Sequence, residues 1–179
     1  MTSVLKVDNI QNSSGTSAIT IDSSGNVTAS GHIKSELPHF VVQAIRPSGG
    51  AQAVTGVIDF NNAEINSGNH YDITNNYFQA PVTGLYCFML NGFACNSSGN
   101  PTSGTITVAF ETSSDASTWT TARKYYAYTN ASAYLPVHTS FIKEMTANDY
   151  IRVNVTNLYL YRYLTGSEGT VTFSGYLIG

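Results

Sequence analysis

The sequence predicts an all-β fold, a β-sandwich or jelly roll preceded by a short β-rich segment. From residue 40 to the end, apolar residues alternate with polar ones at the period of a strand, and the helical period is nearly absent. Glycine, proline, asparagine, aspartate and serine interrupt this alternation at short intervals, as turns do. About nine short strands over some 140 residues favour a sandwich or jelly roll over a meander. We expect strands over residues 39–46, 54–60, 69–73, 84–93, 104–112, 118–128, 134–143, 149–157 and 170–178.

The composition is that of a folded chain with few charges. The 179 residues are enough for one ordinary domain plus an extension, and its core needs neither a metal nor a disulfide. Charged residues make up 11% of the chain, against roughly a quarter in a typical soluble domain. The eight lysines and arginines are scattered, and no apolar run is long enough to span a membrane. We therefore expect neither nucleic-acid binding nor membrane insertion.

Both cysteines, Cys87 and Cys95, fall within one predicted strand. At roughly 3.3 Å per residue they would lie about 26 Å apart. A disulfide requires Cα atoms within about 7 Å of each other. We therefore expect two reduced thiols.

Residues 1–36 differ in character from residues 37–179. Asn12-Ser13-Ser14-Gly15 recurs ten residues later as Asp22-Ser23-Ser24-Gly25, and both are turn signals with β-rich residues between them. One copy of this segment has too few apolar residues for a core of its own. We expect it to become ordered by pairing with copies of itself or with a host surface. It is interpreted as a stalk or attachment segment, and residues 37–179 as the head domain.

The most specific motif runs from Phe60 to Leu90. Its landmarks are aromatic, asparagine and glycine residues at defined spacings: Phe60, Asn66, Tyr71, Phe78, Gly84, Tyr86 and Phe88. The motif resembles the signature of the globular head of complement subcomponent q and of the related tumour-necrosis-factor jelly rolls. Leu90 stands where that signature has an aromatic residue. The segments 39–42, 57–60, 147–153 and 172–178, the last with Phe173 and Gly175, resemble further strands of the same family in the same order.

This resemblance implies a homotrimer of jelly rolls. Tyr86, Phe88 and Leu90 share one face of their strand and are expected to point between the two sheets, while Cys87 and Met89 point the other way. Since both faces are apolar, both are expected to be covered. In the family the second cover is the neighbouring subunit.

No pattern in the sequence predicts catalytic residues, a cofactor or a metal ligand. His32, His39, His70 and His138 show no metal-ligand spacing, and no nucleophile elbow or phosphate-binding loop is present. Some family members bind calcium, but no carboxylate cluster here matches such a site. The nearest pair of carboxylates in the later half of the head is Glu111 and Asp115, separated by a turn-like Thr-Ser-Ser. A metal held by three copies of one histidine on a trimer axis remains an open alternative.

Two tyrosine-rich runs are the candidate interface or binding surfaces. Tyrosine offers a rigid ring with a polar tip, which suits subunit interfaces and the binding of sugars or proteins. The candidate residues are Tyr125, Tyr126 and Tyr128 in the first run, and Tyr159, Tyr161, Arg162 and Tyr163 in the second.

The N-terminal segment resembles the asparagine-, serine- and glycine-rich openings of phage tail-fibre and other virion proteins. It carries no secretory signal and no Gly-x-y repeat. This resemblance implies a non-enzymatic virion protein, assembled in the host cytoplasm and bound to other virion proteins through residues 1–36. The first hypothesis is a short tail fibre or receptor-binding tip whose head meets a host-surface glycan or protein. The alternative is a capsid decoration or head-fibre trimer, and a third hypothesis is an enzyme such as a glycan depolymerase.

Overall fold

The computed structural model describes residues 7–11, 13–29, 37–45, 52–95, 104–129, 135–160 and 171–178. The chain divides into two compact units, Met1–Glu36 and Leu37–Gly179. Within the described residues, no helix is long and apolar enough to cross a membrane.

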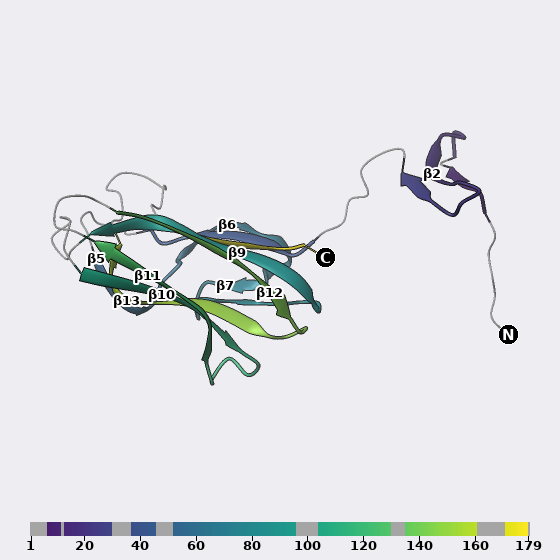
Figure 1. The fold of residues 1–179 in the computed structure, drawn as a ribbon. Helices are drawn as coiled ribbons and strands as arrows, with labels where there is room; N and C mark the ends of the chain where they lie inside the picture. Colours follow the sequence, from purple (N-terminus) through teal and green to yellow (C-terminus); the bar gives the residue numbers. More distant parts are fainter. Residues whose placement is uncertain are drawn as a thin grey trace. The chain divides into compact units, whose positions relative to one another are not determined.

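The N-terminal unit contains a three-stranded antiparallel sheet (Figure 1). Its strands are β1 (Asn9–Gln11), β2 (Ser17–Ile21) and β3 (Val27–Ala29), in that order across the sheet. Gly15 and Gly25, the last residues of the repeated turn signals, have φ angles of 81° and 82°. Only glycine adopts these angles without strain, which explains why each signal ends as it does.

One face of this small sheet is apolar. Ile19 pairs across the sheet with Ile10 on β1 and Ala29 on β3, and Ile21 pairs with Val27. Residues paired in this way share a face. The side chains of Ile10 and Val27 are 48% and 63% exposed, so the unit does not bury this face by itself.

The head unit is built almost entirely of antiparallel strands. They are β4 (His39–Gln43), β5 (Gln52–Val57), β6 (Asn62–Asn66), β7 (Tyr71–Asp72), β8 (Tyr77–Gln79), β9 (Gly84–Cys95), β10 (Gly104–Ser113), β11 (Thr120–Thr129), β12 (Leu135–Met145), β13 (Tyr150–Leu160) and β14 (Thr172–Leu177). A short 3-10 turn, η1 (Ser67–Asn69), precedes β7.

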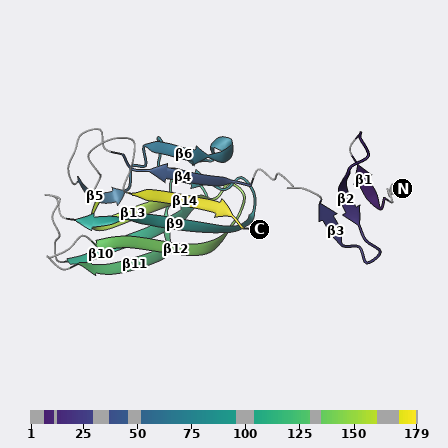
Figure 2. The same ribbon diagram turned by 90° about the horizontal axis from the view of Figure 1, so that it is seen from above.

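The strands form two layers. The first layer has the order β12-β9-β14-β4-β6, and these strands are seen side by side in Figure 2. The second has the order β11-β10-β13, with β5 and β8 paired to β13 and β7 paired to β8. The layers join where the end of β13 pairs with the end of β9. This arrangement confirms the predicted jelly-roll sandwich.

An aromatic core fills the space between the layers. The rings of Phe40 and Phe78 stack at 4.8 Å between centroids, and those of Phe110 and Phe141 lie at the same distance. Aliphatic side chains from both layers complete the core, and the largest fully buried side chains are Tyr86, Phe40, Phe60, Phe78, Phe88, Phe110, Phe173, Ile58, Leu90, Met145 and Ile151. Leu90 is 1% exposed, so it fills the place at which the signature has an aromatic residue.

The expected strands differ from the observed ones at the start of the signature. The strand expected at 54–60 ends at Val57, and that expected at 69–73 is reduced to β7 because η1 occupies its beginning. Strand β6 was not expected. Its residues, Asn-Ala-Glu-Ile-Asn, read as polar because β6 is the edge strand of its layer, where little of it is buried. Cys87 and Cys95 lie in the same strand, β9, as predicted, and Cys87 is a free thiol.

Candidate functional site

The residues of the signature form the centre of the head. Its aromatic members, together with Phe173 of the last strand, are all between 0% and 3% exposed: Phe60, Tyr71, Phe78, Tyr86, Phe88 and Phe173. Gly84 is the first residue of β9. The signature residues thus hold the sandwich together rather than forming a surface site.

Asn66 fastens the loop between β6 and β7. Its Oδ1 accepts a hydrogen bond from the backbone N–H of Tyr71, and its Nδ2 donates to the carbonyl of the same residue, both at 2.9 Å. The side chain therefore bridges the five-residue connection in the way a neighbouring strand would. The turn contains Gly68 at a φ of 71°, with Asn69 at 57°.

Gly175 leaves the core no spare room. A Cβ atom at this position would lie 2.6 Å from a ring carbon of Phe40 and 2.7 Å from one of Phe88. No side chain fits there unless both rings move. The glycine of β14 is therefore required by the packing of two aromatic side chains.

The outer surface of the first layer is an apolar sheet face, defined here as Val41, Leu85, Cys87, Met89, Ile142 and Tyr176. Cys87 pairs directly with Ile142 on β12 and Tyr176 on β14, so the three side chains form one row. Ile142 is 58% exposed, Tyr176 44% and Leu85 40%. A single chain leaves this face open. The expected burial of both faces of β9 is therefore found on one face only.

The first tyrosine run divides between the two sides of β11. Tyr125 is half-buried, packs edge-on against Phe110, and donates a hydrogen bond from its phenol to the carbonyl of Ser140 on β12. It thereby links the edge strands of the two layers. Tyr126 and Tyr128 point away from the core and are 69% and 71% exposed.

The second tyrosine run cannot be assigned to a surface. Tyr159 lies on β13, and its backbone pairs with β5 and β9. Residues 161–163, which comprise Tyr161, Arg162 and Tyr163, lie outside the described residues.

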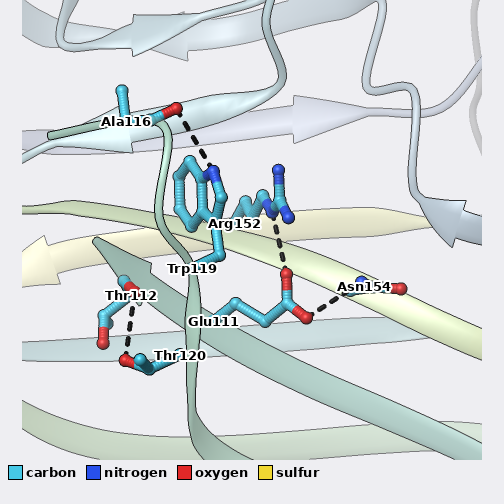
Figure 3. A network of polar contacts seen from close by, with 7 residues as sticks. All are labelled: Glu111, Thr112, Ala116, Trp119, Thr120, Arg152 and Asn154. Carbon is cyan, nitrogen blue, oxygen red and sulfur yellow. Dashed lines mark hydrogen bonds and ion pairs between the residues drawn. The ribbon is translucent and has the colours of Figure 1, made fainter.

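A polar and aromatic network lies on the outer surface of the second layer (Figure 3). The guanidinium carbon of Arg152 lies 4.0 Å from the centroid of the Trp119 ring. Arg152 Nε donates to Glu111 Oε2 at 2.8 Å, and Asn154 Nδ2 donates to Glu111 Oε1 at 2.9 Å. Arg152 and Asn154 alternate along β13 with the buried Ile151 and Val153, which places the network on the outward face.

Further rings extend this network. The Tyr77 ring lies 6.2 Å from that of Trp119 and 5.1 Å from that of Tyr150, centroid to centroid. Gln79 Nε2 donates to the Tyr150 phenol at 3.0 Å. Burial, together with the Asp72 carboxylate, raises the pKa of the Tyr77 phenol, which hydrogen-bonds to Asp72. We name Tyr77, Trp119 and Tyr150 the aromatic platform.

Sequence reasoning missed this platform. Its three rings come from separate segments, and none belongs to a tyrosine run. The one available signal was that Trp119 is the only tryptophan of the chain.

The turn that carries Trp119 is organised by Asp115. Its Oδ1 accepts hydrogen bonds from the backbone N–H groups of Thr118 and Ser117 and from the hydroxyl of Ser113. These bonds hold the pKa of the Asp115 carboxyl well below its ordinary value. The Trp119 indole N–H in turn donates to the carbonyl of Ala116 at 3.2 Å.

Glu111 and Asp115 therefore do separate work. The first binds Arg152, and the second caps a turn, so they are not arranged as a catalytic acid–base pair. Among the described residues there is no cluster of three or more histidine, cysteine or carboxylate side chains that could hold a metal. A hollow of about 260 Å³ beside the turn is lined mainly by hydroxyl groups, with Lys143 and Asp149.

Comparison with known proteins identifies the head. The C1q domain model matches residues 40–178. The chain belongs to the C1q domain family. Domains of this family are typically oligomeric and generally non-enzymatic.

Solved structures agree with this assignment. The C1q head of this chain is similar to the globular domain of zebrafish complement 1qA protein, with 18% sequence identity and a TM-score of 0.53. The match covers 80% of this chain and 98% of the zebrafish chain, and at this identity it establishes the fold alone. A search of curated proteins gives no match.

Proposed function

We propose that the protein is a homotrimeric, non-enzymatic binding head that works on the surface of a particle. The observation that carries the proposal is the apolar sheet face. Its row of Ile142, Cys87 and Tyr176 is uncharged and open, and contiguous exposed apolar surface of this kind is typical of an interface. In a trimer, the neighbouring subunit would cover it.

The N-terminal unit supports the same assembly. Its apolar face, with Ile10, Ile19 and Val27, is also left open, and a small sheet with one uncovered apolar face is marginal in water. A trimeric head would raise the local concentration of three such segments and would favour their association without any new contact in the head.

The particle that we propose is a phage virion, with residues 1–36 bound to other virion proteins. The support is the resemblance of this segment to virion proteins and the turn repeat that ends in Gly15 and Gly25. The leading role is that of a short tail fibre or receptor-binding tip, and the alternative is a capsid decoration or head fibre. Assembly would take place in the host cytoplasm.

Mass measurement tests the trimer. Light scattering on the full chain is expected to give about three times its 19.2 kDa. Ile142→Asp is expected to yield monomers, since a charge would be buried in the interface, whereas the exposed side chain costs the single chain little. Thr156→Asp, at an exposed position of β13 in the second layer, is the matched control and should remain trimeric. A monomeric native chain would defeat the proposal.

Imaging tests the particle. Gold-labelled antibody against the head, or a density map of the intact virion, is expected to place the protein at the tail. Location on the capsid would instead support the decoration role. Absence from purified virions would remove the particle from the proposal.

A further inference from the structure

The aromatic platform lies on a surface that the proposed trimer leaves free. Tyr77 and Gln79 flank the buried Phe78, and Tyr150 and Arg152 flank the buried Ile151, so these side chains point outward from the second layer. The apolar sheet face belongs to the first layer. A subunit that covers the first layer would therefore leave the platform open to solvent.

The tryptophan at the centre of the platform is held in place before any ligand arrives. Arg152 lies over its ring, its N–H is bound to Ala116, and the turn before it is fixed by Asp115. Ala116 has a φ of 58°, a conformation that non-glycine residues seldom adopt and that costs on the order of 1 kcal/mol. A surface side chain fixed in this way loses little conformational entropy on binding, and this favours recognition.

Polar groups surround the rings in a pattern that suits hydroxyl groups. Gln79 binds the Tyr150 phenol, Asp72 binds the Tyr77 phenol, and Glu111 accepts from both Arg152 and Asn154. A pyranose ring has an apolar C–H face and a rim of hydroxyls. Half-buried aromatic rings bordered by carboxylate and amide groups can contact both.

The local charge selects the class of sugar. Arg152 is neutralised by its ion pair with Glu111, and the other charge at the platform is the carboxylate of Asp72. The pKa of that carboxyl is lowered by its hydrogen bonds, chiefly that from the Asn75 side chain, so it is ionised at neutral pH. An anionic sugar would meet this charge without an unpaired cation to offset it.

From these observations we propose that Tyr77, Trp119 and Tyr150 form a binding platform for a neutral glycan. The proposal rests on the proposed function, because a free outer face is assumed, and it names the ligand class of that head. Arg152 acts as a positioning residue, holding the indole rather than binding the sugar through its charge.

The sole tryptophan makes the test specific. Trp119 emission would be followed while the trimer is titrated with glucose-, galactose-, mannose- and N-acetylglucosamine-based oligosaccharides, and with sialylated and uronate-containing ones. At least one neutral oligosaccharide is expected to change the emission in a saturable way, and the anionic ones are not. Absence of a saturable change with every neutral probe would overturn the proposal, as would a preference for the anionic ones.

Two variants locate the binding. Tyr77→Ala is expected to weaken the responding oligosaccharide at least tenfold, because one of the three rings is lost. Tyr126→Ala removes an equally accessible tyrosine from the same layer and should leave the affinity unchanged. Equal affinity in native chain and Tyr77→Ala would place the sugar elsewhere and would overturn the proposal.

Failure of this inference can be told apart from failure of the proposed function. The mass of each variant by light scattering reports the trimer independently of any sugar. A trimer that binds no neutral oligosaccharide defeats the inference alone. A monomeric native chain defeats the proposed assembly, whatever the titration gives.

Discussion

Arg152 lies over the ring of Trp119 at 4.0 Å and donates to Glu111 at 2.8 Å, so one side chain joins a surface loop to two strands. Glu111 is on β10 and Arg152 on β13, 41 residues apart in the chain. Both charged side chains are largely buried, at 15% and 22% exposed. The contact therefore carries energy as well as position, because a cation is drawn to the face of an indole.

Removal of the arginine should loosen the tryptophan. Arg152→Ala leaves the Glu111 carboxylate without its ion pair, and we expect a loss of about 1–3 kcal/mol in the free energy of unfolding. The emission of Trp119 should shift to the red as the ring becomes more solvated. Urea unfolding followed by this emission measures both effects. Arg123→Ala, at an exposed position of β11, is the control, and an unchanged emission in Arg152→Ala would contradict the contact.

Gly175 should tolerate no side chain. Gly175→Ala places a methyl group 2.6 Å from Phe40 and 2.7 Å from Phe88, so both rings must move or leave their rotamers. Overpacking of this kind costs about 1–3 kcal/mol. Thermal unfolding should show a lower midpoint for this variant, while Thr156→Ala on an exposed strand position stays near the native value. An unchanged midpoint for Gly175→Ala would mean that the two rings are not packed as described.

Asn66 offers a graded test. Asn66→Asp keeps the acceptor for the N–H of Tyr71 but loses the donor to its carbonyl, whereas Asn66→Ala loses both. Net hydrogen bonds in proteins are worth roughly 0.5–1.5 kcal/mol each. Chemical denaturation should therefore rank native above Asn66→Asp and Asn66→Ala lowest. If both variants lost the same stability, the donated bond would contribute nothing.

The sequence was sufficient for the sandwich because its inward residues alternate cleanly. Tyr86, Phe88 and Leu90 on β9 are all buried, as the period of two predicts. It was not sufficient for the aromatic platform, since Tyr77, Trp119 and Arg152 meet only after strands far apart in the chain pair. Strand β6 was missed for another reason. An edge strand buries little, so its composition resembles a loop.

Acid should release the Trp119 turn. The pKa of the Asp115 carboxyl is lowered in the folded protein, so its contribution to stability is present above the unfolded pKa near 4 and is lost as the pH falls toward the folded value. Below about pH 4 the bonds to Thr118 and Ser117 should weaken, and Trp119 emission should change before the head unfolds. Asp115→Asn should remove this early transition. An identical acid profile in the two proteins would show that Asp115 does not control the turn.

The N-terminal sheet should associate through its apolar face. Ile19 lies at the centre of that face, between Ile10 and Ala29, and the neighbouring Thr20 points to the opposite face. If three segments pack with these faces together, a cysteine at position 19 will meet its counterpart in another chain. Mild oxidation of Ile19→Cys should then give covalent dimers in high yield on a denaturing gel, while Thr20→Cys and the native chain give few. Equal cross-linking of the two variants would mean that the apolar face is covered by something other than a second copy of this chain.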